Sequence, residues 1–268
     1  MAGNKIFRGY MKTVHKFLYK YYRSVCNLEL SLCDKYIHFE LPSEYNDVFD
    51  SAISAHDEDL SHLMCTDSAI NIIIQYTDRE YKERVANIDF SNTQNFTDML
   101  GLVKKELGEA VSNKIKNRVL KNFTNIQASN NKVACFSERP DSILMWSHYG
   151  DALKGGCLCF DTTKDIELFS NAQKIQYTDT RVHRDGFNQY FVKSSVWAYE
   201  QEWRIVVDQQ SDRIYTDSIY GLILGEKMCL GDFFRLSLKA SEMGIPVYKA
   251  SADREIYKIN IAKWGGSV

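Results

Sequence analysis

The chain has 268 residues, of which 44% are hydrophobic and 25% are charged, and its formal net charge at pH 7 is −2. This composition is typical of a folded globular protein with a sizeable core, and it excludes the disordered and fibrous classes. The nearly balanced charge gives no overall attraction to nucleic acid or to an anionic membrane, so such a partner would need a local patch.

The seven cysteines are scattered along the chain without a C-x-x-C pair. An odd number without paired spacing argues against both a disulfide framework and a zinc site, and favours a reducing compartment. No stretch approaches the roughly 18 apolar residues of a membrane-spanning helix, and the N-terminal segment has no apolar signal core. We therefore expect a cytoplasmic protein with no membrane partner.

The N-terminal part of the chain predicts a strand over residues 16–24, although its aromatic residues also fit one face of a helix. A short helix at Leu28–Cys33 and a strand at Tyr36–Phe39 follow. The next loop is rich in turn-forming residues, which usually have a structural role. The functional alternative is that Asn46 and Asp47 line a cleft and contact substrate.

Residues 59–128 change to helical spacing with charged faces, which predicts a mainly helical insert within one domain spanning residues 1–268. The basic residues of this insert are interrupted by glutamates, so we expect a solvated surface here in preference to a nucleic-acid patch.

The central stretch predicts two short buried strands, at 133–136 and 157–160, on either side of a helix. Asp141 or Ser142 can cap this helix at its start, and glycines end it. Its last residues concentrate polar and aromatic chemistry and are the best candidate wall of a site: Trp146, Ser147, His148 and Tyr149.

The C-terminal part alternates short strands with helices. The predicted elements are strands at 174–179, 203–207, 220–225, 246–250 and 255–261, and helices at about 187–195 and 231–244. Together with the central strands they predict an α+β fold with a single mixed β-sheet.

A pair of glutamates, Glu200 and Glu202, lies among aromatic residues in the sequence WAYEQEWR. In an extended segment their side chains would share one face. Carboxylates set among aromatic rings tend to be desolvated, which shifts their pKa values and prepares them for catalysis. The alternative is structural, with one of them paired to Arg204 or Arg23 to fix the sheet.

Six motifs in this order resemble the bacterial family catalogued as domain of unknown function 2971, over roughly residues 18–225. They are K-Y-x-R, F-x-x-P-S-E-Y-N-D-x-F-D, C-F-S-E, M-W-S-H-Y, G-x-C-L-x-F-D and Y-E-x-E-W-R. The chain departs from the family pattern at Val48, where the family has a proline.

The layout of these motifs is also similar to that of ADP-ribosyltransferases, which consume NAD. This resemblance implies that Arg23 holds the NAD pyrophosphate, and that Ser137 or His148 holds the nicotinamide ribose. Tyr149 would stack on nicotinamide, with Trp146 as a further cofactor-binding residue. Glu202 would stabilise the oxocarbenium ion as the catalytic carboxylate, and Glu200 would position a protein or nucleic-acid acceptor. The implied role is a toxin or anti-phage effector.

Two alternatives stay open at this point. His148 could act with Glu202 in a metal-independent nuclease, because histidine titrates near neutral pH. The aromatic cleft could instead belong to a non-catalytic module in phage defence that binds a nucleotide or a protein. The other histidines lack the spacing of metal ligands, so we expect no metal site.

Overall fold

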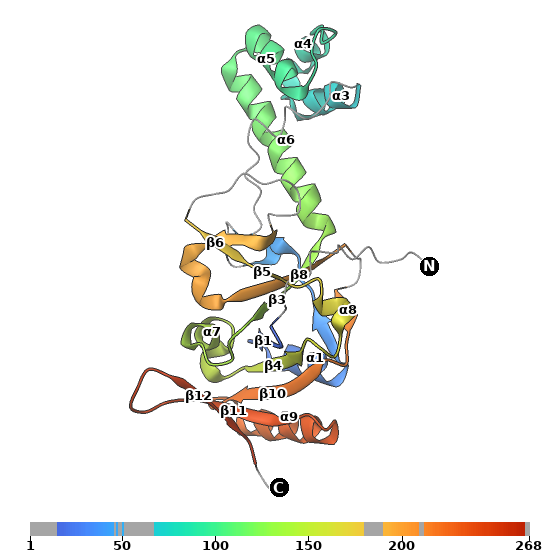
Figure 1. Cartoon of the computed structure of the whole chain (residues 1–268). Helices are drawn as coiled ribbons and strands as arrows, with labels where there is room; N and C mark the ends of the chain where they lie inside the picture. The colour runs from blue at the N-terminus through green and yellow to red at the C-terminus, as the bar shows by residue number, and fades with distance from the viewer. Residues whose placement is uncertain are drawn as a thin grey trace. The chain divides into compact units, whose positions relative to one another are not determined.

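The computed structural model describes residues 15–45, 47, 50, 67–179, 190–208 and 212–265 (Figure 1). The chain divides into two compact units. The first, which we call the sheet unit, comprises residues 1–51, 130–180 and 190–268. The second, the helical unit, comprises residues 52–129 and 181–189.

An eight-stranded sheet forms the centre of the sheet unit, in the order β12-β11-β10-β4-β1-β3-β8-β5. Only the pair β10 and β11 is parallel, and the other pairs are antiparallel. In the same order the strands are Ile259–Lys263, Val247–Ala252, Ile219–Gly225, Gly156–Asp161, Phe17–Tyr22, Lys132–Ser137, Glu202–Val207 and Gln173–Lys174. The predicted α+β fold with a mixed sheet is confirmed.

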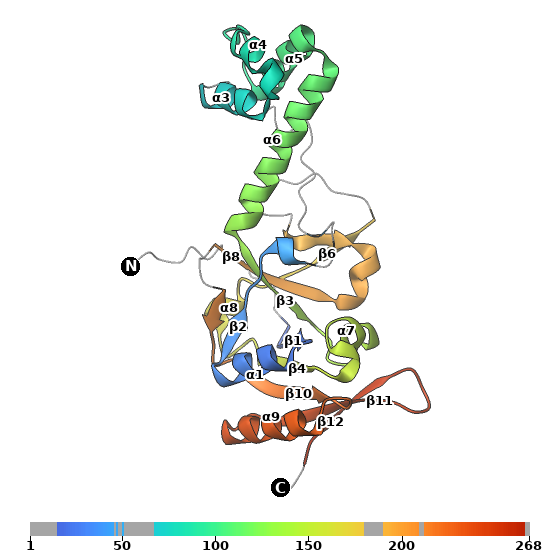
Figure 2. The same ribbon diagram turned by 180° about the vertical axis from the view of Figure 1, so that it is seen from behind.

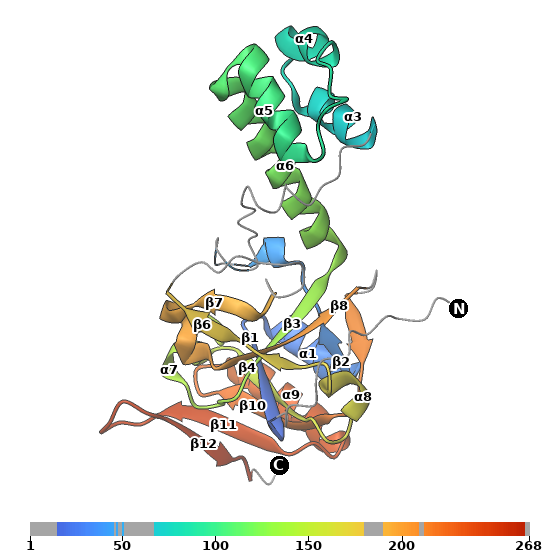
Figure 3. The same cartoon turned by 45° about the horizontal axis from the view of Figure 1, so that its top comes forward.

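Two small sheets and four helices complete the described part of this unit (Figure 3). β2 (Tyr36–His38) pairs antiparallel with β9 (Arg213–Tyr215), and β6 (Gln176–Thr178) pairs parallel with β7 (Val192–Ser194). The helices are α1 (Val25–Cys33), α7 (Ile143–His148), α8 (Ile166–Phe169) and α9 (Leu230–Glu242). Short 3-10 helices cover Pro42–Glu44, Asp151–Leu153 and Ser195–Glu200.

The two faces of the large sheet have separate cores, because successive strand residues point to opposite faces. In β1, Leu18 and Tyr22 belong to the core that includes residues of α1, α8 and α9. Tyr19 and Tyr21 pack on the opposite face, in the core that contains Trp146 of α7. Figure 1 and Figure 2 show α9 alongside β10 and β11, whereas α7 lies beside β1 and β4.

The sheet is joined between β1 and β3 by a single residue pair, Tyr19 with Ser137. By contrast, β1 pairs with β4 along its whole length, and β3 pairs with β8 along its whole length. Beyond Tyr19 and Ser137 the two inner strands are therefore not hydrogen-bonded to each other, and side chains can line a cavity there.

The helical unit contains α3 (Asp67–Tyr76), α4 (Lys82–Ala86), α5 (Phe96–Leu107) and most of α6 (Glu109–Asn130). Its core is apolar and separate from those of the sheet unit. Asp78 forms ion pairs with Lys114 and Arg118 of α6, at 2.7 and 2.8 Å.

No helix in the described residues is long and apolar enough to cross a membrane.

Two local predictions have clear outcomes. The N-terminal strand is confirmed as β1, and the helical alternative for these aromatic residues is not adopted. The helix predicted at about 187–195 is wrong for Val192–Ser194, which form β7, while residues 187–189 lie outside the described residues. The pairing of β7 with β6 decides its structure, and helical spacing of apolar residues cannot reveal such a partner.

Candidate functional site

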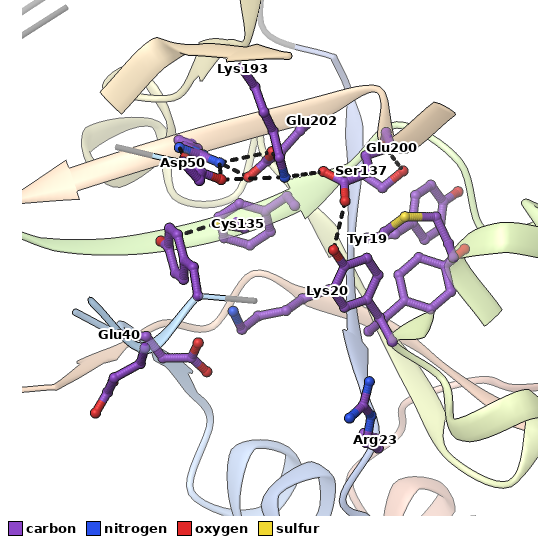
Figure 4. Close-up of a pocket in the computed structure, with 17 residues that line it drawn as sticks. Tyr19, Lys20, Arg23, Glu40, Asp50, Cys135, Ser137, Lys193, Glu200 and Glu202 are labelled. Carbon is purple, nitrogen blue, oxygen red and sulfur yellow. Dashed lines mark hydrogen bonds and ion pairs between the residues drawn. The ribbon is translucent and has the colours of Figure 1, made fainter. Parts of the chain in front are cut away.

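A cavity of about 380 Å³ lies in the sheet unit (Figure 4). Its size is within the usual range for small-molecule sites. The lining comes mainly from β1, β3 and β8, from the segment after β2, and from α7. The lining residues are Tyr19, Lys20, Tyr21, Arg23, Glu40, Glu44, Tyr45, Asp50, Cys135, Phe136, Ser137, Met145, Tyr149, Lys193, Glu200, Glu202 and Arg204.

Glu202 and Arg204 form a buried ion pair in the lining of the cavity. They are two residues apart on β8, so their side chains share one face of the strand. Arg204 donates from Nε to Glu202 Oε1 at 2.6 Å and from its second terminal nitrogen to Glu202 Oε2 at 3.0 Å. It also holds both oxygens of Asp50, at 2.7 and 2.5 Å. Arg204 is fully buried, and its planar guanidinium suits this paired binding of two carboxylates.

Lys193 of β7 joins these residues to Glu200. Its Nζ lies 2.5 Å from Glu200 Oε2, 3.2 Å from Glu202 Oε2 and 3.4 Å from Asp50 Oδ2. The side chains of Lys193 and Glu200 are almost completely buried, at 5% and 4% exposure. In Figure 4 Lys193 lies with Asp50 and Glu202 at one end of the cavity, and Arg23 lies at the other.

The two glutamates are not presented by an extended segment, which corrects the expectation drawn from their spacing. Glu200 ends a 3-10 helix, Gln201 has a left-handed backbone with φ 44° and ψ 54°, and Glu202 begins β8. Both carboxylates still reach Lys193, because the left-handed residue turns the chain sharply between them.

The two carboxylates differ strongly in acidity. Burial and the nearby charge of Glu202 raise the pKa of Glu200 to about 7, although Lys193 and Tyr149 oppose the rise. Burial would also raise the pKa of Glu202, but Arg204 and Lys193 outweigh it and lower that pKa to about 2. A pair whose pKa values are pushed apart is typical of acid and base assignments in active sites.

The protonation of Glu200 sets the net charge of this cluster. Lys193 and Arg204 supply two positive charges against the carboxylates of Asp50, Glu200 and Glu202. The cluster is balanced while Glu200 carries a proton and has a net charge of −1 once Glu200 is ionised. A change in its charge is therefore expected near neutral pH.

Tyr149 and Ser137 hold Glu200 in place. The Tyr149 hydroxyl donates to Glu200 Oε1 at 2.7 Å, and the buried Ser137 hydroxyl donates to the Glu200 backbone carbonyl at 2.7 Å. Tyr149 directly follows α7, and Ser137 ends β3. The fixed carboxylate is a precondition for using it on a substrate.

Arg23 and Lys20 bring further positive charge to the cavity from β1 and the residue just after it. The Arg23 guanidinium is exposed and donates to the His148 backbone carbonyl. Lys20 lies over the ring of Phe136, 5.9 Å from its centroid, and makes no ion pair with any described residue. Both cations remain available to an anionic ligand.

Several of the predicted site residues do not line this cavity. Trp146 is in the core, 1% exposed, and its indole donates to the Pro140 carbonyl at 2.7 Å. The His148 ring lies on the surface, with Nδ1 2.8 Å from the Tyr199 hydroxyl. Asp47 is buried but does not belong to the lining, and Asn46 lies outside the described residues.

Other residues of the site were not predicted. Asp50 and Lys193 complete the ion cluster, and Tyr45 and Cys135 close it on one side, with the Tyr45 hydroxyl 3.3 Å from Cys135 Sγ. Burial raises the pKa of the Cys135 thiol to about 12. The pairing of Glu202 with Arg204 is the structural alternative that the spacing of WAYEQEWR suggested, and it coexists here with a cavity.

Within the residues that the structure describes, no group of three or more His, Cys, Asp or Glu side chains is placed to hold a metal ion. The chain matches no protein-family model, no curated protein and no solved structure. The geometry of the cavity is therefore the basis for a functional proposal.

Proposed function

We propose that the protein is an ADP-ribosyltransferase-like enzyme that consumes NAD to modify a macromolecule, with Glu200 and Glu202 as its catalytic residues. The observation that carries the proposal is the meeting of three features on one cavity: Arg23 after β1, Ser137 at the end of β3, and the two glutamates, of which Glu200 ends a 3-10 helix and Glu202 begins β8. β1, β3 and β8 are neighbours in the sheet, and Ser137 is in register with both Tyr19 and Glu202.

The acidities of the two glutamates support different roles in this reaction. Glu202 stays ionised at neutral pH and suits the stabilisation of positive charge that develops on the ribose. Glu200, whose pKa is about 7, suits a general base for the acceptor, because an effective base has a pKa near the working pH.

In the proposed transfer, the bond between ribose C1′ and the nicotinamide nitrogen breaks, and its electron pair leaves with nicotinamide. The acceptor nucleophile forms a new bond to C1′, and its proton passes to the Glu200 carboxylate. The products are nicotinamide, the ADP-ribosylated acceptor and one proton, which later leaves Glu200.

Arg23 has the charge and exposure to hold the pyrophosphate of NAD, and Tyr149 has a ring on the cavity wall for nicotinamide. Trp146 supports this wall from the core and does not line the cavity. The nuclease alternative lacks comparable support, because the His148 imidazole is bonded to Tyr199 outside the lining.

The second candidate is a non-catalytic module that binds a nucleotide or a protein. It is favoured by the complete pairing of Glu202, whose two oxygens are both held by Arg204. In this case the cluster would stabilise the walls of a binding cavity, and ligand would raise the melting temperature without turnover.

A cytoplasmic site of action and a role as a toxin or anti-phage effector are part of the proposal. The six described cysteines are all free, which fits a reducing compartment. Expression of the wild type should arrest bacterial growth, or restrict phage, more strongly than expression of Glu200→Gln at the same protein level.

The deciding experiment incubates the purified protein with NAD labelled in both halves and with cell lysate, and follows released nicotinamide and label on macromolecules. Glu200→Gln should lower release about 10²–10⁴-fold, since it removes a general base. Glu202→Gln should lower it about 10²–10³-fold, with folding checked by circular dichroism. Glu242→Gln, on an exposed part of α9, is the matched control.

If Glu200→Gln and Glu202→Gln release nicotinamide as fast as the wild type, the assigned roles of the two glutamates are contradicted. Binding of NAD without any release, by a folded wild type, would favour the non-catalytic module.

A further inference from the structure

A second cavity, of about 320 Å³, adjoins the first around Arg23. The two cavities share Lys20, Tyr21, Arg23, Glu40 and Tyr149. The rest of the second lining comes from Tyr22, from α1 and its cap, and from β2 and β9. These residues are Tyr22, Ser24, Asn27, Leu30, Ser31, Tyr36, His38 and Arg213.

Positive charge dominates this lining. Lys20, Arg23 and Arg213 face one carboxylate, Glu40. Arg213 stacks on the ring of Tyr36, 4.6 Å from its centroid, which directs its guanidinium along the wall. Guanidinium groups bind phosphate through paired hydrogen bonds. His38 also lines the cavity, 3.9 Å from Glu40 and 3.8 Å from Asp212.

The first turn of α1 adds donors of the same kind. Ser24 caps this nine-residue helix and accepts from the Asn27 backbone amide at 3.3 Å. Both residues line the cavity, so the start of the helix faces it. The N-terminus of a helix favours anions, because its first amide groups lack partners within the helix and its dipole is positive there.

Two buried hydroxyls provide an independent indication of a missing ligand. Tyr22 and Ser31 are 6% and 1% exposed, and neither hydroxyl makes a hydrogen bond of normal geometry to a described residue. Burial raises the pKa of the Tyr22 phenol, and the neighbouring Ser31 hydroxyl partly opposes that rise. Two neighbouring hydroxyls have two hydrogens, and their mutual contact can use only one. At least one of these hydrogens therefore has no acceptor among the described residues.

We propose that the second cavity binds the phosphate group of a small molecule, with the phosphate near Arg23, Arg213 and the first turn of α1. Such a group offers an acceptor to the hydroxyl pair, and its negative charge complements three cations that face a single carboxylate. A water molecule in the liquid takes about 30 Å³, so the cavity also has room for an organic group attached to the phosphate. The inference goes beyond the proposed transfer reaction, because it does not require that NAD is cleaved.

The test is calorimetric titration of the full chain with inorganic phosphate, AMP and ADP-ribose. Arg213→Gln and Asn27→Asp should each weaken phosphate and AMP binding about tenfold or more, since they remove or oppose a charged hydrogen bond. Asn27→Asp should still fold, because an acidic residue in the first helical turn is favourable. Asn113→Asp, on an exposed part of α6 in the helical unit, makes the same chemical change at a residue outside the lining and should leave binding unchanged.

Absence of binding at millimolar phosphate and AMP would overturn the proposal, as would wild-type affinity in both site variants. If ADP-ribose displaces phosphate, the site holds the ADP-ribose part of NAD. If both bind together, it serves a separate phosphorylated ligand. Phosphate binding without nicotinamide release would refute the proposed transfer reaction alone, and release without phosphate binding would refute only this site.

Discussion

We expect the free energy of unfolding of the wild type to fall between about pH 5 and pH 8, and Glu200→Gln should abolish most of this fall. Burial and the charge of Glu202 raise the pKa of Glu200 from 4.5 to about 7. The folded protein therefore holds this proton more tightly than the unfolded chain. Its contribution to stability is fully present below 4.5 and is lost as the pH rises through 7. Each pKa unit is worth about 1.36 kcal/mol, so the loss amounts to about 3 kcal/mol.

Gln suits this test because it has nearly the size of Glu and keeps an acceptor for the Tyr149 hydroxyl. Urea unfolding of wild type and variant at pH 5, 6, 7 and 8 would give the free energy of unfolding at each pH. Tryptophan fluorescence reports on the sheet unit alone, because all four tryptophans lie in it: Trp146, Trp197, Trp203 and Trp264.

The wild type and the Glu242→Gln control should lose about 3 kcal/mol over this range, and Glu200→Gln should lose much less. Glu202 behaves oppositely, because its pKa is lowered from 4.5 to about 2. Its contribution is present above 4.5 and is lost as the pH falls through 2, so Glu200→Gln should keep that acid loss. An unchanged decline from pH 5 to pH 8 in Glu200→Gln would refute the assignment of the titration to this residue.

Four further substitutions test the contacts of the two carboxylates and the backbone at two positions. Arg204→Met should lower the free energy of unfolding at pH 7 by about 3–5 kcal/mol, because it leaves buried carboxylates without their main cation; a urea midpoint like that of the exposed control Arg235→Met would contradict this. Tyr149→Phe removes a hydrogen bond that lowers the pKa of Glu200, so that pKa should rise above about 7; ¹³C NMR titration of the glutamate carboxyls would detect the rise, and an unshifted midpoint would count against it. Gln201→Gly should stabilise the protein by up to about 1 kcal/mol, since a left-handed backbone is strained in other residues. Gly155→Ala should lower the melting temperature, because its Cβ would lie 2.1 Å from the Tyr22 carbonyl oxygen. Thermal unfolding of both variants is the measurement: a Gln201→Gly protein that melts below the wild type, or a Gly155→Ala protein that melts above it, would contradict the respective prediction.

Elements with a strong local pattern could be predicted from the sequence. The strand predicted at 203–207 is β8, Glu202–Val207, and the helix predicted at 231–244 is α9, Leu230–Glu242. Val192–Ser194 could not be assigned correctly in this way. Its strand depends on pairing with Gln176–Thr178, and the apolar residues around it fit a helical period equally well.

In the site, too, residues that lie close together in the sequence could be predicted, and residues that meet only through the fold could not. Glu200, Glu202 and Arg204 could be found from their spacing, because they belong to one short segment. Asp50 could not, since it meets Arg204 across 154 residues of chain. Lys193 lies in the segment that was wrongly predicted as a helix, and its ion pairs with Asp50, Glu200 and Glu202 join residues that the sequence does not place together.

The left-handed Gln201 explains why two glutamates so close in sequence differ in acidity. Glu202 lies in β8, where the two-residue repeat places it beside Arg204, and the guanidinium keeps it ionised. The turn at Gln201 removes Glu200 from that repeat, so Glu200 is left with Lys193 and the Tyr149 hydroxyl. If residues 200–202 were all extended, both carboxylates would compete for Arg204 on one face of the strand. A single backbone conformation therefore creates one permanent anion and one group that titrates near neutral pH, which is the division of roles that the proposed reaction requires.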